Sequence, residues 1–375
     1  MIYVQHLLGI GHFRRALFLA QALAVKGFEV DLVSGGMPVS NAKLPNIKLH
    51  QLPPLRSLDN SFTRLLDESG KPISDDYRQQ RSNRLLELFD LISPDAVITE
   101  TYPFGRRMMR FELLPLLNAI RQRSKPPLLI ASIRDILQPK TKANREQEIV
   151  ELVDGYYDRI LVHGDESMAR LADTFSMASE LAQKTFYTGY ICEPASDVTA
   201  DNTGKNEVLV SGGGGVVSLQ LLTTALEAKP LSRLHQKTWR LLAGFNIDEN
   251  SFNQLRNQAG NGIIVERNRS DFQALLRQCT VSVSQAGYNT TMDILGSGAH
   301  AVMVPFADAG ELEQTIRARL LQQHGRVIAL DEKNLTANSL ARAVNLASEM
   351  PKLSMKLKMD GANVSADLLQ DWLYA

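Results

Sequence analysis

The residues with the clearest chemical potential lie within 282–317, where two short apolar segments each end in polar residues. The first segment runs into a turn at Gly287, and the helix that follows carries the carboxylate of Asp293. The second leads to a polar loop that ends in Glu313 and Gln314. Parallel strands bind ligands at their carboxyl ends, and a helix N-terminus attracts a diphosphate through its free N–H groups and its dipole. The pattern predicts a nucleotide-sugar site in which Asp293 meets the ribose hydroxyls.

This segment resembles the donor-binding half of the GT-B glycosyltransferases of family 28, the group with the UDP-N-acetylglucosamine transferase of peptidoglycan synthesis. That group has a Ser-x-Ala/Gly-Gly turn, an acid on the next helix, a Pro-Phe pair and a later Gln, here Ser284, Gly287, Asp293, Pro305, Phe306 and Gln314. The family most often has Glu in place of Asp293, so the reach of this acid differs. The alternative is an ordinary strand, turn and helix of any α/β fold. The resemblance implies donor contacts by Ser284, Gln285, Gly287, Tyr288, Asn289, Thr290, Asp293, Glu313 and Gln314.

The composition is that of a globular protein with room for two domains. The chain has 375 residues, of which 44% are hydrophobic and 22% are charged. Lys plus Arg and Asp plus Glu both number 41, so bulk charge gives no reason to expect nucleic acid as a partner. Cys192 and Cys279 cannot form a disulfide framework and lack metal-ligand spacing. Without a charged leader or a run of 18 apolar residues, a cytoplasmic protein with no transmembrane helix is expected.

Apolar segments alternate with longer helical patterns along the chain, which predicts βαβ units and a parallel sheet. The first strands are expected at 2–8, 29–34, 96–100, 128–134 and 159–163. A stretch at 188–205, rich in Gly, Pro and small polar residues, indicates a linker, and a second α/β series starts after it.

We therefore predict an α/β protein of two Rossmann-like parallel-sheet domains, over 1–190 and 206–350. The resemblance to GT-B enzymes implies that the domains face each other across a cleft. It also implies that the helical segment 351–375 packs back toward the N-terminal domain. The polar stretch 55–84 is expected to form a long loop followed by a helix.

The first predicted strand ends in a glycine turn that leads to His12 at the start of a helix. A helix N-terminus disfavours the imidazolium, so a neutral His12 could take a proton from an attacking hydroxyl. Arg14 occupies the position of the third glycine of the dinucleotide fingerprint, which argues against NAD. The alternative is a histidine whose ring bonds only to the local backbone.

This Gly-x-Gly-His turn is similar to the corresponding loop of the transferase group. It also resembles the Gly-His-x-x-Arg turn of UDP-sugar hydrolases of pseudaminic acid biosynthesis, with Arg15 as the matching arginine. The resemblance implies that His12 is the catalytic base and that Gly11 belongs to the nucleotide site.

A second glycine turn, at 211–216, follows a strand predicted at 207–210 and precedes a helix. Consecutive glycines expose backbone N–H groups that suit a phosphate, and a flexible turn is the alternative. The turn lacks the Lys-Ser/Thr of a P-loop. The resemblance implies that Gly213, Gly214 and Gly215 contact the donor diphosphate, and that the backbone from Val265 to Arg267 pairs with uracil.

Polar residues follow three strands of the N-terminal domain and are expected at the rim of the same cleft. We interpret them as acceptor-side residues, with a purely structural role as the alternative: Glu100, Tyr102, Arg134, Asp135 and His163.

Residues 104–125 hold six basic residues and one acid, with apolar residues between them. One interpretation is a peripheral contact with an anionic membrane at its inner face, or with a lipid-linked acceptor. A second is an arginine site for an anionic acceptor group. The third is an amphipathic helix with a solvated basic face.

The leading hypothesis is an inverting, metal-independent glycosyltransferase that uses a nucleotide-diphosphate sugar, with UDP as the nucleotide and no cofactor. A UDP-sugar hydrolase with water as acceptor, a nucleotide-sugar 2-epimerase and a non-catalytic nucleotide-sugar sensor are the alternatives. The sequence leaves open the sugar and the acceptor.

Overall fold

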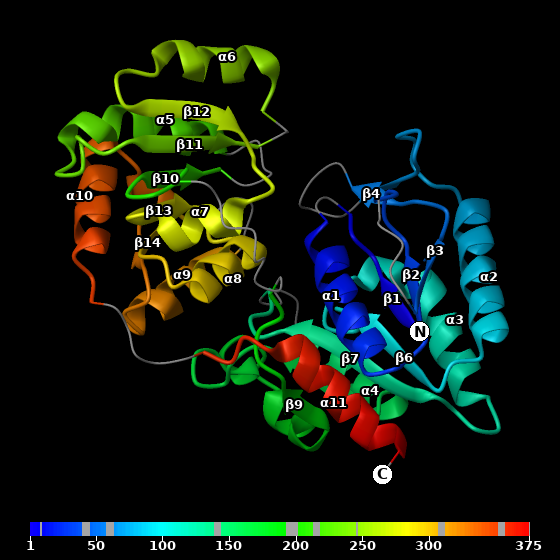
Figure 1. Cartoon of the computed structure of the whole chain (residues 1–375). Helices are drawn as coiled ribbons and strands as arrows, with labels where there is room; N and C mark the ends of the chain where they lie inside the picture. The colour runs from blue at the N-terminus through cyan, green and yellow to red at the C-terminus, as the bar shows by residue number, and fades with distance from the viewer. Residues whose placement is uncertain are drawn as a thin grey trace. The chain divides into compact units, whose positions relative to one another are not determined.

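The computed structural model describes residues 1–7, 10–39, 46–57, 64–138, 144–192, 202–212, 218–244, 247–306, 312–351 and 357–374. The chain divides into two compact units. One consists of Met1–Cys192 together with Lys358–Ala375, and the other of Glu193–Leu357 (Figure 1). Each unit is built on its own parallel β-sheet, so the prediction of two Rossmann-like α/β domains is confirmed.

The first unit contains a sheet of seven strands, all parallel. In spatial order they are β3 Ile47–Gln51, β2 Val30–Ser34, β1 Ile2–Val4, β6 Ala96–Glu100, β7 Leu128–Arg134, β8 Arg159–His163 and β9 Thr185–Tyr187. The strands predicted at 96–100, 128–134 and 159–163 match residue for residue. Because β1 lies between β2 and β6, the turn after β1 meets the carboxyl end of β6.

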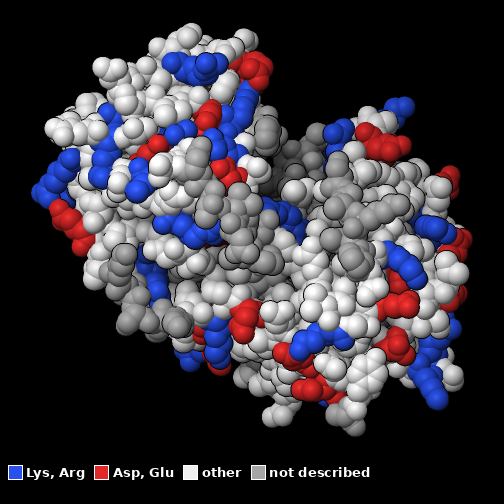
Figure 2. Space-filling view, viewed as in Figure 1, with Lys and Arg blue, Asp and Glu red and all other residues white. Residues whose placement is uncertain are grey.

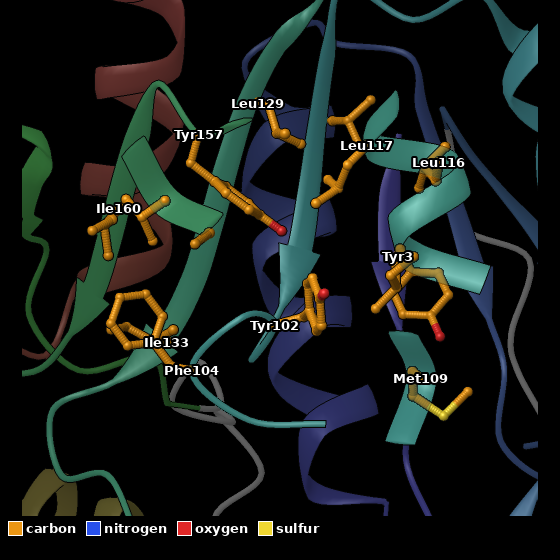
Figure 3. Close-up of a cluster of buried hydrophobic side chains, with 14 of the residues drawn as sticks. Tyr3, Tyr102, Phe104, Met109, Leu116, Leu117, Leu129, Ile133, Tyr157 and Ile160 are labelled. Carbon is orange, nitrogen blue, oxygen red and sulfur yellow. The ribbon is translucent and has the colours of Figure 1, made fainter. Parts of the chain in front are cut away.

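Helices cover both faces of this sheet, namely α1 Gly11–Val25, α2 Asp75–Ile92, α3 Arg110–Arg121, α4 Arg145–Tyr156 and α11 Gly361–Tyr374. Successive strand residues point to opposite faces, so Ile2 and Val4 pack with α1 and α11 while Tyr3 packs with α2, α3 and α4. Figure 3 shows Tyr3 in this second core near Met109 and Leu116.

The C-terminal helix α11 lies along α1 in the first unit (Figure 1). Trp372 meets Phe186 of β9 edge-on, with ring centroids 5.0 Å apart, and Tyr374 stacks on Phe28. The last helix of the chain therefore completes the core of the first unit.

The polar stretch 55–84 differs from the expected loop. Arg56–Ser57 (β4) pairs antiparallel with Leu65–Leu66 (β5), and α2 begins at Asp75. Ser74 caps α2 by accepting a hydrogen bond from the Tyr77 backbone N–H. Short 3₁₀ turns elsewhere are η1 Arg107–Met109, η2 Leu171–Asp173, η3 Ala178–Lys184, η4 Lys229–Leu231 and η5 Glu332–Asn334.

The basic segment 104–125 forms η1 and α3, and its apolar side is buried in the core of the first unit. Its arginines pair with acids on neighbouring elements. The pairs are Arg107 and Arg110 with Glu148, Arg121 with Asp158, and Arg123 with Asp90. Figure 2 shows Lys and Arg interspersed with Asp and Glu on the face in view. These contacts favour the third interpretation, an amphipathic helix whose basic face is solvated and partly paired.

The second unit contains a sheet of six parallel strands. In spatial order they are β12 Ile263–Arg267, β11 Trp239–Ala243, β10 Val208–Ser211, β13 Val281–Ser284, β14 Ala301–Met303 and β15 Ile328–Ala329. Its helices are α5 Ser218–Ala228, α6 Glu249–Gln258, α7 Phe272–Gln278, α8 Tyr288–Ser297, α9 Glu313–Gln323 and α10 Ala337–Ser348. The sheet packs on α5, α6 and α10 through a buried core centred on β10 and β11.

Among the described residues, none of the helices combines the length and the apolar character that crossing a membrane requires.

Candidate functional site

The first part of the site forms where the turn after β1 meets the end of β6. His12 lies in the first turn of α1, and its Nδ1 is 2.9 Å from Oε1 of Glu100, the last residue of β6. The guanidinium of Arg15, one helical turn later, forms an ion pair with the same carboxylate. Thr101 Oγ1 is 3.1 Å from Nδ1. Residues that are 88 positions apart in the chain thus form one cluster at the carboxyl edge of the sheet.

The contacts of His12 determine which ring nitrogen is available for chemistry. Nδ1 of His12 lies 2.9 Å from Glu100 Oε1 and 3.3 Å from Arg15 Nη2. Arg15 keeps the Glu100 carboxylate ionised, and a carboxylate only accepts hydrogen bonds, so the shorter contact places the proton of His12 on Nδ1. No described residue forms a hydrogen bond with Nε2. Burial lowers the pKa of His12 well below its usual 6.5, and the charges of Arg106, Arg134 and Arg15 lower it further. The ring is therefore neutral, with an available lone pair on Nε2.

Glu100, predicted at the acceptor rim, instead lies beneath His12 with only 2% of its side chain exposed. Ser132 Oγ donates to its second oxygen at 2.7 Å. His163, also predicted on the acceptor side, is fully buried behind Ser132, with Nε2 2.9 Å from Oγ. Neither side chain is placed to touch an acceptor directly.

Tyr102 is the clearest correction among the acceptor-side residues. Its ring is 1% exposed and lies in the same hydrophobic core as Phe104 and Tyr157 (Figure 3). Burial raises the pKa of its hydroxyl to about 12. The sequence predicted Tyr102 at the rim of the cleft, but the structure shows that it belongs to the hydrophobic core.

Arg134 and Asp135 follow β7 at the same edge of the sheet. Arg134 is half-buried and close enough for its charge to lower the pKa of His12. Asp135 is 1% exposed and accepts a hydrogen bond from the Ile136 backbone N–H at 2.8 Å. Of the acceptor-side set, Arg134 is the residue whose charge acts on His12 from a partly exposed position.

In the second unit, β13 ends at Ser284 and α8 starts after Gly287, as the sequence predicts. Ser284 is fully buried, and its Oγ donates to the backbone oxygen of Gln285. Gly287 is the N-cap, so the first N–H groups of α8, from Tyr288 to Thr290, have no carbonyl within the helix. This end of α8 is chemically suited to a phosphate.

The side chains at the start of α8 differ in burial. Asn289 and Thr290 are half-buried. Tyr288 is 5% exposed, and the guanidinium of Arg317 lies 5.4 Å from its ring centroid. The ring of Tyr288 therefore packs inside the unit. Of the polar groups of this residue, the backbone N–H is the remaining candidate for contact with a nucleotide sugar.

Asp293 is half-buried and held by a neighbouring helix, because Gln273 of α7 donates to its Oδ1 at 2.9 Å. Sequence reasoning did not single out Gln273, and its position on a different helix gave no local signal. This hydrogen bond holds one oxygen of the Asp293 carboxylate in a defined position.

Glu313 and Gln314 begin α9, after the end of β14. Glu313 accepts a hydrogen bond from Arg317 at 2.6 Å, and Gln314 Oε1 accepts one from the Phe306 backbone N–H at 3.1 Å. Arg317 also donates to the backbone oxygen of Ala286. Arg317, which sequence reasoning missed, thus links the start of α9 to the turn before α8.

Val265 and Arg267 lie on β12, at the edge of the sheet. Val265 packs against the core. The guanidinium of Arg267 donates to the backbone oxygens of Gly244 and Ile247 and lies 4.1 Å from the ring centroid of Phe252. Its side chain is therefore engaged within the second unit by Gly244, Ile247 and Phe252.

Three residues of the predicted site lie outside the described residues. These are the glycines of the second turn, Gly213, Gly214 and Gly215. Gly11 is the first residue of α1. Across the described ranges, there is no group of three or more His, Cys, Asp or Glu side chains that could hold a metal.

Comparison with known proteins shows which class of proteins this chain resembles. Residues 208–371 match the model of the glycosyltransferase family 28 C-terminal domain. Over 72 residues the chain is 32% identical to the UDP-N-acetylglucosamine–N-acetylmuramyl-(pentapeptide) pyrophosphoryl-undecaprenol N-acetylglucosamine transferase of Nitrosomonas eutropha. This match spans 19% of the present chain and 20% of that relative.

Similarity to solved structures extends over nearly the whole chain. The glycosyltransferase of kitacinnamycin superposes with a TM-score of 0.67 at 19% identity, covering 99% of this chain and 98% of that one. UGT2 of Phytolacca americana, solved with UDP-2-fluoroglucose and pterostilbene, gives 0.65 at 12% identity, covering 99% and 94%.

The fold is therefore the GT-B fold of glycosyltransferases, which confirms the predicted fold class. Within this class, residues 208–371 match the C-terminal domain of glycosyltransferase family 28, in agreement with the resemblance found in the sequence.

Proposed function

We propose that this protein is an inverting glycosyltransferase that moves a sugar from a UDP-sugar to an acceptor hydroxyl. The observation that carries the proposal is the pairing of His12 with Glu100. It leaves a neutral imidazole with an available Nε2 at the carboxyl edge of a GT-B sheet. Transfer is favoured over hydrolysis and epimerisation because the matches reported above are to transferases.

In the proposed reaction, Nε2 of His12 takes the proton of the acceptor hydroxyl as its oxygen attacks the anomeric carbon of the sugar. The new carbon–oxygen bond forms as the bond to the diphosphate breaks, and UDP leaves with the electron pair. Attack on the face opposite the leaving group inverts the configuration. Glu100 stabilises the imidazolium that forms, as the carboxylate of a catalytic triad does.

On the donor side, the N-terminus of α8 and the glycine turn at 213–215 stabilise the departing diphosphate by backbone N–H groups. Asp293 accepts from the ribose, and Glu313 and Gln314 contact the ribose or the sugar. Support comes from the family 28 domain and from the orientation of Asp293 by Gln273. A UDP-sugar is also the donor analogue in the complex of UGT2. The proposal assigns no metal and no cofactor.

The class of acceptor that we propose is taken from the name of the Nitrosomonas relative and not from the geometry of the site. The Nitrosomonas relative acts on a pyrophosphoryl-undecaprenol acceptor, so a lipid-linked, anionic acceptor is the first class to test. Contact with a membrane through residues 104–125 is not part of the proposal, because the apolar side of α3 lies in the core.

The proposal is tested by ligand-induced thermal shifts with UDP, GDP, dTDP, CDP and NAD, followed by assays of UDP-sugars with and without acceptors. We expect a selective shift with UDP and transfer that exceeds hydrolysis. His12→Ala should abolish turnover and keep the UDP shift, whereas His50→Ala, at the distant β3, should keep both. A shift with no nucleoside diphosphate, or full turnover by His12→Ala, would refute the proposal.

A further inference from the structure

A continuous line of buried hydrogen bonds runs from the Glu100 carboxylate to the far side of β8. Ser132 Oγ lies 2.7 Å from Glu100 Oε2 and 2.9 Å from His163 Nε2. His163 Nδ1 lies 2.9 Å from Thr188 Oγ1. Ser132, His163 and Thr188 are each at most 1% exposed. These residues come from the ends of β7 and β8 and from the segment after β9, so three adjacent strands contribute to one line.

The protons in this line have one self-consistent arrangement. Ser132 has a single hydroxyl proton and two neighbours, the ionised Glu100 and His163. If Ser132 gave its proton to His163, its lone pairs would face the carboxylate oxygen at 2.7 Å, which places two acceptors in contact. Ser132 therefore donates to Glu100, and His163 donates to Ser132 from Nε2. Nδ1 of His163 then carries no proton and lies 2.9 Å from Thr188 Oγ1, whose single proton is shared between this nitrogen and the Gly189 backbone oxygen at 3.0 Å.

From His163 through Ser132, both hydrogen bonds thus point toward Glu100. His163 can hold this role only as a neutral ring, and burial, with a smaller effect from Arg15, lowers its pKa well below 6.5. One oxygen of Glu100 receives Ser132, while the other receives His12, Arg15 and Thr101. With both oxygens occupied, the carboxylate cannot rotate without losing a buried hydrogen bond.

From this geometry we propose that Ser132 and His163 are positioning residues that fix the tautomer of His12 through Glu100. The line holds the carboxylate in the orientation that requires a proton on Nδ1 of His12, and so keeps Nε2 available. Neither residue touches substrate. The inference rests on the proposed function only for its effect on turnover, because the tautomer of His12 exists with or without activity.

Two substitutions of His163 separate this role from simple packing. His163→Gln places an amide N–H near the position of Nε2 and keeps a donor to Ser132. His163→Asn places its amide near Nδ1 and loses that donor. Ser132→Ala removes the link at its centre with little change in volume. His50→Gln, which alters a histidine that contacts Asp31 on the distant edge of the sheet, is the matched control.

The first readout is the ¹⁵N chemical shift of the His12 ring in the full chain labelled at histidine. We expect the Nδ1–H tautomer to dominate in the unsubstituted protein, His163→Gln and His50→Gln, and to mix with the Nε2–H tautomer in Ser132→Ala and His163→Asn. The second readout is kcat, which should fall about 10- to 100-fold in the latter pair with little change in KM.

The outcomes distinguish this inference from the proposed function. An unchanged tautomer in Ser132→Ala and His163→Asn, or an equal effect of His163→Gln and His163→Asn, would overturn the inference. Absence of transferase turnover in the unsubstituted protein would refute the function, while the tautomer shifts would still decide the role of Ser132 and His163.

Discussion

In the proposed mechanism, Glu100 is the residue that makes His12 usable as a base. It fixes the proton on Nδ1, and its ion pair with Arg15 holds the carboxylate in place. Glu100→Gln keeps the shape but can present an amide N–H to Nδ1, which would favour the wrong tautomer. Loss of the orienting carboxylate in a comparable triad costs about 10⁴-fold in kcat, and we expect a loss of about 10²- to 10⁴-fold here. UDP binding by thermal shift should stay unchanged, so a parallel loss of both would argue for misfolding.

With His12 as the proposed base, the pH profile of kcat/KM should report the protonation of His12 in the free enzyme. A base works when it is unprotonated, so activity falls as the pH drops through its pKa. Because burial and nearby arginines lower the pKa of His12 well below 6.5, the acid limb should lie below pH 6.5. Activity should therefore stay level between pH 8 and pH 6.5. A limb centred at or above pH 6.5 would contradict the assigned environment of His12.

At this scale the sequence predicted His12 as a base but not its partner. The helix N-terminus and the glycine turn are local features, so they can be recognised from adjacent residues. The contact with Glu100 depends on the adjacency of β1 and β6, which only the sheet order establishes. Tyr102 was misplaced for a related reason, since being next to a polar strand end does not determine which way a ring turns.

At the scale of elements, one buried charge network joins α2 and α3 to β1. Arg81 and Glu112 are both fully buried, with Arg81 Nε donating to Glu112 Oε2 at 2.5 Å. The remaining Arg81 donors meet Gln5, Gly35 and Pro53, and Tyr3 donates to Glu112. Every partner of this ion pair lies in the first unit.

We expect Glu112→Leu to lower the free energy of unfolding of the first unit by about 3 to 5 kcal/mol, because it leaves Arg81 buried without its carboxylate. The double substitution Arg81→Met with Glu112→Leu should recover much of that loss. Urea unfolding of the full chain with Glu112→Leu, with Arg81→Met and with both substitutions measures these effects. A double variant as unstable as the sum of the two single variants would show that the two residues do not interact.

The elements that the sequence predicted best are the central strands of the first sheet. The segments 96–100, 128–134 and 159–163 are short apolar runs buried on both faces, which is the pattern of parallel strands. The stretch 55–84 was predicted less well, because β4 and β5 have two residues each and cannot establish a period. Arg81 carries no signal of burial in the sequence, because its partners come from four distant segments.

At the scale of the whole molecule, the chain consists of two units with separate cores, and its last helix belongs to the first. Trp372 of α11 contacts Phe186, and the guanidinium of Arg159 lies 5.5 Å from the Trp372 ring centroid. A C-terminal segment that completes an N-terminal core makes the stability of the first unit depend on residues far along the chain.

This arrangement predicts that the two units respond to different perturbations. Trp372→Ala should destabilise the first unit by about 2 kcal/mol, since the ring is half-buried and a fully buried one costs about 3 to 5 kcal/mol. For a unit of this size, that corresponds to a fall of about 4 to 8 °C in Tm. UDP at 100 times its Kd should instead stabilise the second unit by about 2.7 kcal/mol.

Calorimetry of the full chain, with and without UDP, separates the two effects. Because Trp372 packs in the first core and the proposed donor contacts lie in the second unit, Trp372→Ala should lower one transition while UDP raises the other. The size of the UDP shift should be the same in the variant and in the unsubstituted protein. If UDP and Trp372→Ala acted on the same transition, either the donor site or the thermodynamic independence of the units would be wrong. Asp293→Ala decides which, because it should abolish the UDP shift only if the donor site is in the second unit.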